Sequence, residues 1–430
     1  MAQFGTMFLG IVAGIFVSRL LGPEGRGVFA LFKANSEFLV LFLGFGLGSG
    51  VTYFTSNKKI PIRHLFGMSI AGFTAGSVLS ALLILALPIL GYQRIFFPSN
   101  FDTAWFRNYL AVLFIIANAG VVLTAFLNGR QRFGLTNFAK TSQAAVFLVF
   151  AVALFLYSDH SLLFRNTTLV LVALFASTML STVYLVVCVL FEFRGEGSPE
   201  FRFDTDLKVA GGFIYLVYLG ELINFFNYRL DVWLVQYFQN SYQLGLYTLA
   251  VSVAQMLWLI ATPVTIVLLP YLNGTRSDDE AQPMFLFYAR LTFTLTFLSC
   301  VALYFVGEYL LPFVYGAKFV ESVPAFRLLL IGVLFSSVSK VMSVYVVTQG
   351  LMRYNVLSVS AGVIVTFALD MVLIPSYGIQ GASIATSVSY FVIFLFLIWV
   401  LRSKLELKNW NVFVPAGADF QRIRQKTKLW

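Results

Sequence analysis

Residues Val28–Gly44 read VFALFKANSEFLVLFLG, a mostly apolar run that contains two charged side chains, Lys33 and Glu37. A helix of about 20 predominantly apolar residues is long enough to cross a bilayer. Lys33 and Glu37 are four residues apart, so they share one face of such a helix and can pair. Charges within a membrane helix are costly and usually face a partner or a polar cavity. The segment therefore predicts a membrane-spanning helix with one polar face.

The rest of the chain has the same character. Of its 430 residues, 59% are hydrophobic and only 11% are charged, whereas about a quarter of the residues of a soluble protein are charged. We therefore predict an all-α integral membrane protein with about 12 transmembrane helices. The predicted spans are 2–21, 28–56, 66–92, 106–128, 137–158, 167–191, 208–237, 245–271, 284–312, 324–348, 355–374 and 380–401.

One charged connector, FEFRGEGSPEFRFDTDLK, divides these spans into two groups of six. We predict an N-terminal six-helix bundle (1–191), a cytoplasmic linker (192–207), a C-terminal six-helix bundle (208–401) and a basic cytoplasmic tail (402–430). Most Lys and Arg residues of the loops fall on one side if the N-terminus is cytoplasmic, which predicts that both termini are cytoplasmic. The net charge of +10 is thereby assigned to cytoplasmic loops and not to nucleic-acid binding.

The two groups of six also show a weak internal duplication. GVFAL (Gly27–Leu31) resembles GLYTL (Gly245–Leu249), and GRQRF (Gly129–Phe133) resembles GLMRY (Gly350–Tyr354), at a nearly constant offset. Six spans in each repeat give both halves the same orientation. Parallel repeats of this kind occur in transporters whose substrate cavity lies between the two halves.

Several kinds of chemistry are excluded. Cys188 and Cys300 lie in apolar runs, and His64 and His160 form no cluster, so no metal site and no disulfide framework is predicted. The glycine run GFGLGSG (44–50) lacks the preceding strand and the Gly-Lys-Ser/Thr ending of a phosphate loop, so we expect it to permit close helix packing or bending. We predict no catalytic residue, no cofactor and no enzymatic activity.

The charged residues within the predicted spans are the candidate site. Cations there suit an anionic substrate, and carboxylates there can titrate or bind a coupling ion, H⁺ or Na⁺. The alternative is that these charges only neutralise one another or lock the two bundles together, and Arg19, Lys140 and Arg290 are close enough to span ends to snorkel. The candidate cationic residues are Lys33, Arg229, Lys340, Arg19, Lys140 and Arg290, and the candidate ion-coupling or charge-pairing residues are Glu37, Glu221, Asp231 and Asp370.

Three stretches resemble a known family. They are SRLLGPEGRGVFAL (Ser18–Leu31), NYRLDVWLVQYFQNSYQLGLYTLA (Asn227–Ala250) and LIPSYGIQGASIATSVSY (Leu373–Tyr390). Together they are similar to the polysaccharide-transporter branch, the Wzx-type oligosaccharide-lipid flippases, of the multidrug/oligosaccharidyl-lipid/polysaccharide (MOP) exporter superfamily. Arg229 and Asp231 match the Arg-x-Asp pattern of that branch, whereas Asp370 stands where the branch often has Asn.

The resemblance implies a V-shaped fold like that of the MATE transporters, made of two six-helix bundles with alternating access. It implies a protein of the bacterial cytoplasmic (inner) membrane that moves an undecaprenyl-pyrophosphate-linked oligosaccharide, a repeat unit of O-antigen, capsule or exopolysaccharide, to the outer leaflet. Expected partners are the lipid-linked oligosaccharide, membrane lipid, a polysaccharide polymerase and glycosyltransferases. Two alternatives stay open: a cation-coupled multidrug exporter of the same superfamily, and a membrane glycan polymerase or transferase.

Overall fold

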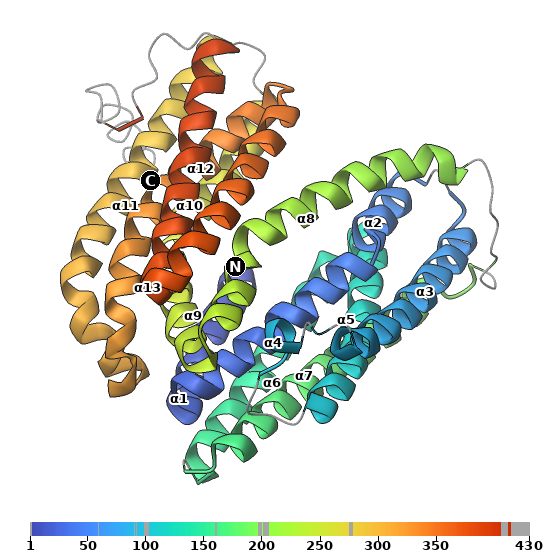
Figure 1. Cartoon of the computed structure of the whole chain (residues 1–430). Coiled ribbons are helices and arrows are strands. Elements are labelled where there is room, and N and C mark those ends of the chain that lie inside the picture. The colour runs from blue at the N-terminus through green and yellow to red at the C-terminus, as the bar shows by residue number, and fades with distance from the viewer. Residues whose placement is uncertain are drawn as a thin grey trace, which may run out of the picture. The chain divides into compact units, whose positions relative to one another are not determined.

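The computed structural model describes residues 2–58, 60–89, 91, 93–98, 103–159, 161–196, 200, 206–274, 278–405 and 412–413. Within these ranges the chain is helical, with short turns between helices and no β-strand (Figure 1). The helices are α1 (Ala2–Leu43), α2 (Leu47–Asn57), α3 (Ile62–Ile89), α4 (Gln93–Phe96), α5 (Thr103–Gly129), α6 (Phe133–Tyr157), α7 (Leu163–Glu192), α8 (Asp206–Phe238), α9 (Ser241–Gln255), α10 (Trp258–Gly274), α11 (Asp278–Tyr315), the 3₁₀ helix η1 (Ala317–Ser322), α12 (Val323–Thr348) and α13 (Met352–Ser403).

The chain divides into two compact units. The first unit comprises residues 1–225 and 240–245, and the second comprises residues 226–239 and 246–430. Helix α8 therefore contributes its first part to one unit and its last part to the other. The bundle boundary predicted at the 192–207 connector stays a prediction. Much of this connector and of the tail lies outside the described residues, as does His160.

In the first unit, α1 packs against α6, α7 and α5, and α2 packs against α5 and α3. Its packed interior is rich in phenylalanine: Phe32 and Phe106 are fully buried and meet edge to face, and Phe66 stacks on Phe126. In lipid such close packing, rather than the hydrophobic effect, holds helices together.

In the second unit, α12 is the most enclosed helix and packs against α10, α11 and α13. Small residues allow the close approach. A Cβ at Gly332 would lie 2.6 Å from the Cα of Ser387, and the Ser387 hydroxyl donates to the carbonyl of Leu328 on α12 at 2.9 Å. Ser389 likewise donates to the carbonyl of Gly362 at 2.9 Å. Small residues and hydroxyl hydrogen bonds are the usual adhesive between membrane helices.

The all-α membrane fold predicted from composition is confirmed. Eight helices of the described residues are long and apolar enough to cross a membrane, and the bent pair α9–α10 would add a ninth. Helices α1 and α13 each hold two of the predicted spans, because a non-helical glycine, Gly22 or Gly378, interrupts each of them. Helix α8 covers the remaining predicted span, 208–237.

Two predicted spans are broken rather than continuous. The span predicted over 28–56 is interrupted between α1 and α2, where Phe45 and Gly46 have positive φ angles of 50° and 67°. The span predicted over 245–271 is α9 and α10, which meet at an angle of 45°. The glycine run 44–50 therefore bends the chain, as expected. A hydropathy pattern reports apolar length and does not register a local change of backbone direction.

Candidate functional site

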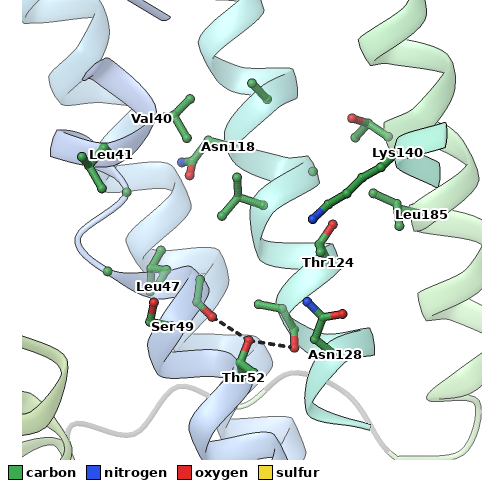
Figure 2. A pocket seen from close by; sticks show the side chains of 18 of the residues that line it. Val40, Leu41, Leu47, Ser49, Thr52, Asn118, Thr124, Asn128, Lys140 and Leu185 are labelled. Atoms are coloured by element: carbon green, nitrogen blue, oxygen red, sulfur yellow. Dashed lines mark hydrogen bonds between the residues drawn. The ribbon is translucent and has the colours of Figure 1, made fainter. Parts of the chain in front are cut away.

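The first unit contains a pocket of about 930 Å³ with polar and apolar side chains in its lining, which comes from α1, α2, α5, α6, α7 and α8 and from the break between α1 and α2. We call it the N-unit pocket. The turn at Gly44–Gly46 brings backbone to its wall, because glycine at 46 adopts a left-handed φ without steric cost. Figure 2 shows α2 and α5 side by side along this wall, where the Thr52 hydroxyl donates to the carbonyls of Gly48 (2.9 Å) and Ala125 (3.3 Å).

Three of the predicted charged residues line this pocket: Glu37 of α1, Lys140 of α6 and Glu221 of α8. Lys140 is exposed, and Figure 2 shows its side chain extending from α6 toward Thr124 of α5. Glu221 accepts a hydrogen bond of 2.6 Å from the Ser49 hydroxyl. The lining therefore holds one cation and two carboxylates among the described residues.

Uncharged polar groups make up most of the remaining hydrogen-bonding surface. The Gln143 amide donates to the Thr178 hydroxyl at 2.9 Å, which ties α6 to α7. Asn118 is 1% exposed, and neither its Nδ2 nor its Oδ1 has a hydrogen-bond partner among the described residues. The amide and hydroxyl residues of the lining are Ser49, Thr52, Tyr53, Ser56, Asn118, Thr124, Asn128, Gln143, Thr178, Ser181 and Thr182.

A second group of polar residues lies in the second unit, around two carboxylates. Asp370 of α13 is completely buried, and neither of its carboxylate oxygens has a hydrogen-bond partner among the described residues. Asp231 of α8 is 6% exposed, accepts a hydrogen bond from the Tyr247 hydroxyl and lies within electrostatic range of Asp370. Tyr247 also lies 3.1 Å from the Thr386 hydroxyl. We call these four residues the carboxylate cluster.

The carboxylate cluster has the donor set of a small hard cation. Carboxylate and hydroxyl oxygens suit such ions, and three buried carboxylate oxygens, Asp231 Oδ1 and both oxygens of Asp370, have no hydrogen-bond partner among the residues that the structure describes. No group of three or more His, Cys, Asp or Glu side chains that could hold a metal ion occurs within the described ranges. A proton shared by the carboxylates, or a monovalent cation, would satisfy the unpaired oxygens.

Lys340 of α12 occupies an aromatic site in the same unit. Its Nζ lies 4.2 Å from the ring centroid of Trp258 and 5.5 Å from that of Tyr228. Trp258 begins α10, directly after the bend that follows α9, and its indole donates to the Ser336 hydroxyl at 2.8 Å. The Lys340 ammonium is thus held by ring faces, which attract cations, and not by a carboxylate.

The remaining predicted cations do not line the N-unit pocket. Lys33 pairs with Glu37 at 3.9 Å as the spacing predicted, but the Lys33 side chain is 55% exposed and does not line the N-unit pocket. Arg229 interacts electrostatically with Asp231. Arg19 is exposed on α1, and Arg290 is buried on α11. The functional role of each predicted residue stays a prediction.

Comparison with known proteins identifies the family. The sequence profile of the family described as "Polysaccharide biosynthesis protein" matches residues 16–324. The chain belongs to this family. An uncharacterized membrane protein of Methanocaldococcus jannaschii is 22% identical over 313 residues, which cover 69% of this chain and 60% of that protein. The chain thus spans less than two thirds of that relative's length.

Solved structures with the same fold are also found. One is similar with a TM-score of 0.74 and 14% identity, over 100% of this chain and 90% of the other: "Lipid II flippase MurJ, inward closed conformation". A MATE-family multidrug resistance transporter of the MOP superfamily, in an inward-facing conformation, gives a TM-score of 0.75 and 13% identity, over 94% and 96% of the two chains. The chain therefore shares the all-helical fold of these two proteins.

The uncharged residues of the N-unit pocket and of the carboxylate cluster were not predicted from the sequence. Asn118 lies in the predicted span 106–128, and Thr386 in the span 380–401, where single polar residues are inconspicuous. Tyr247 and Trp258 look like ordinary membrane aromatics. A search for amides and hydroxyls on one helical face, in addition to charges, would have identified Asn118, Thr124 and Asn128.

Proposed function

We propose that the protein is a flippase that moves a polyprenyl-pyrophosphate-linked oligosaccharide from the inner to the outer leaflet of the bacterial cytoplasmic membrane. Membership of a polysaccharide biosynthesis family supports a substrate of this class. The transport would supply repeat units of O-antigen, capsule or exopolysaccharide to a polymerase, after glycosyltransferases have built them on the cytoplasmic side. The distribution of Lys and Arg residues in the loops supports cytoplasmic termini.

The observation that carries the proposal is a pocket within apolar helices whose lining contains many polar side chains. Sugar hydroxyls and phosphates cannot enter hydrocarbon without losing their hydrogen bonds to water, at a cost of several kcal/mol for each unpaired group. The N-unit pocket offers replacement hydrogen bonds along α2, α5, α6 and α7. The isoprenoid chain needs no such pocket, because it can stay in lipid.

We further propose that transport is coupled to a cation, H⁺ or Na⁺, at the carboxylate cluster. Within the described part of the chain, three buried carboxylate oxygens of Asp231 and Asp370 have no hydrogen-bond partner, which is costly, although Arg229 offsets part of the charge of Asp231. A bound cation offsets that cost. A coupling ion that binds one conformation of the transporter more tightly than another would shift the equilibrium toward the first. The size of the shift equals the difference between its two binding free energies.

The test is the orientation of lipid-linked oligosaccharide in inverted membrane vesicles, with and without this protein. In such vesicles the original cytoplasmic leaflet faces outward, so a glycosidase added outside removes only sugars that have not been moved. We expect protein-dependent protection of the sugar from the glycosidase. Equal digestion in the two vesicle preparations, with the protein present at normal amounts, would contradict the flippase proposal.

The second candidate is a cation-coupled multidrug exporter, favoured by Glu37 and Glu221 in the N-unit pocket and by the MATE-like fold. It predicts accumulation of a cationic dye such as ethidium in the same vesicles. We rank it lower because the pocket also holds Lys140 and many uncharged hydrogen-bonding groups, which a cationic drug does not need.

A further inference from the structure

We propose that the sugar portion of the transported lipid, and not its pyrophosphate, occupies the N-unit pocket, where the Asn118 amide recognises it. This inference rests on the proposed flippase function and assigns one part of the substrate to one site. It separates the pocket from the predicted cationic residues that suit the pyrophosphate.

The charge of the pocket is the first argument. Among the described residues, Glu37, Glu221 and one cation, Lys140, line it, and Glu37 is paired with Lys33 at 3.9 Å. A pyrophosphate carries several negative charges, and the carboxylate of Glu221, which accepts a hydrogen bond from Ser49, repels such a group. An uncharged ligand meets no such repulsion. Carboxylates are good acceptors for sugar hydroxyl donors.

The pattern of donors and acceptors is the second argument. The hydroxyls of Thr52, Ser181 and Thr182 each donate to a backbone carbonyl, at 2.9, 3.1 and 3.3 Å. Because each hydroxyl hydrogen is already donated, each oxygen can only accept a hydrogen bond from a ligand, in a fixed direction. Lys140 adds ammonium donors near Thr124. A ligand that both donates and accepts at many positions fits this lining, and a sugar is such a ligand.

Asn118 is the third and most specific argument. Its amide is 1% exposed and lacks a hydrogen-bond partner among the described residues, although it lines the pocket. Gly44 and Gly76 lie beside it, and a Cβ on either would stand 3.4 Å from Oδ1 or 3.7 Å from Nδ2. These are ordinary contact distances, so the two glycines border the amide, while a Cβ on either would overlap a backbone carbonyl oxygen, that of Val40 or Leu43. A primary amide can donate and accept at the same time, which matches a pair of neighbouring hydroxyls or the acetamido group of a sugar.

Substrate protection of a pocket cysteine tests the proposal in the full-length protein. Cys188 and Cys300 are first replaced by Ala, and Thr124→Cys then places one thiol in the pocket. A small water-soluble methanethiosulfonate reagent modifies it in purified protein in nanodiscs. Three probes are compared: the polyprenyl-pyrophosphate-linked oligosaccharides extracted from cells that make the protein, the free oligosaccharides released from them by mild acid, and polyprenyl pyrophosphate without sugar.

We expect the first two probes to slow modification of Thr124→Cys and the third to leave its rate unchanged. Gln131→Cys, in the turn between α5 and α6, is the control, and its rate should not respond to any probe. Protection by sugar-free polyprenyl pyrophosphate, or by ethidium but not by oligosaccharide, overturns the inference. Movement of the lipid-linked donor in vesicles without protection by free oligosaccharide overturns only this inference, whereas no movement at all contradicts the flippase itself.

A substitution at Asn118 separates recognition from folding. Asn118→Leu removes an unpaired buried amide, so the protein should be at least as stable to heating as the parent. The same change should weaken protection by oligosaccharide about tenfold, the effect of losing roughly one or two hydrogen bonds to the ligand. Asn224→Leu, on α8 outside the pocket, should leave protection unchanged. A purely structural Asn118 would instead give a destabilised protein with normal protection.

Discussion

Buried carboxylates in the second unit are the residues whose function can be tested most directly. Asp370 has no exposed surface and no hydrogen-bond partner within the described residues. Asp231 accepts a hydrogen bond from the Tyr247 hydroxyl, which also lies 3.1 Å from the Thr386 hydroxyl, and interacts electrostatically with Arg229. Packing alone does not explain two buried carboxylates, because apolar side chains of the same size would be buried at a smaller cost in free energy. We therefore expect the carboxylate cluster to act in coupling.

Asp370→Asn should abolish the ion dependence of transport while the protein still folds. The amide keeps the size of the side chain but cannot neutralise a cation. We expect sugar movement driven by an imposed H⁺ or Na⁺ gradient to fall at least about tenfold, since couplings of this kind are worth on the order of 1–3 kcal/mol. The measurement is flipping in proteoliposomes with and without the gradient. Glu308→Gln, which removes an exposed ion pair with Arg327, is the control and should behave like the parent.

Lys340 should contribute to stability through the aromatic rings that surround it. Lys340→Met removes the ammonium from the faces of Trp258 and Tyr228 and should lower the free energy of unfolding by about 0.5–2 kcal/mol. Lys340→Arg keeps a cation that can stack on the rings and should lose less. Thermal unfolding in detergent measures both. Equal losses in the two variants would mean that the cation–ring contact is not what stabilises this position.

At the scale of elements, a reciprocal contact of two glycines fixes how α1 meets the start of α9. A Cβ on Gly27 would overlap the carbonyl oxygen of Ser241, and a Cβ on Gly245 would overlap that of Pro23. These glycines open GVFAL and GLYTL, the two matched stretches of the internal duplication. The helices cross where each repeat places its glycine, so only the absence of both side chains permits this spacing.

Gly245→Ala should therefore destabilise the first unit. The added methyl group has no room against the Pro23 carbonyl, and overpacking of this kind costs about 1–3 kcal/mol. Gly220→Ala is the matched control, because a Cβ there meets nothing within 4 Å. It should leave stability unchanged or raise it slightly. Comparing the thermal unfolding of the two variants in detergent tests the crossing, and similar unfolding temperatures would contradict it.

At the scale of the whole molecule, the orientation in the membrane follows from the distribution of basic loops. Gln131 lies in the turn between α5 and α6, beside Arg130 and Arg132, and the exposed Ser161 lies between α6 and α7. The positive-inside rule predicts that Gln131→Cys reacts with a membrane-impermeant thiol reagent only from the cytoplasmic side. Ser161→Cys should react only from outside. The reverse pattern in intact cells and inverted vesicles would overturn the predicted orientation.

Composition alone determined the class of the protein. Charged residues at 11% and apolar residues at 59% indicate a membrane protein. In lipid only helices and closed barrels satisfy their backbone, and the apolar runs of about 20 residues indicate helices. The positions of Lys33 and Glu37 likewise determined their pairing, since residues four apart on a helix are neighbours whatever surrounds them. The order of the spans followed from apolar length.

Tertiary structure alone decided which polar residues meet. Asp231, Tyr247, Thr386 and Asp370 come from three helices, and nothing local in the sequence brings their oxygens together. Lys140 and Asn118 reach the same pocket from α6 and α5, whereas Lys33, on the same helix as Glu37, does not line it. Contacts between helices depend on rotation and on small residues at the crossings, and the break at Gly44–Gly46 depends on left-handed backbone angles. Apolar periodicity fixes none of these, because several rotations of a membrane helix bury equally apolar surface.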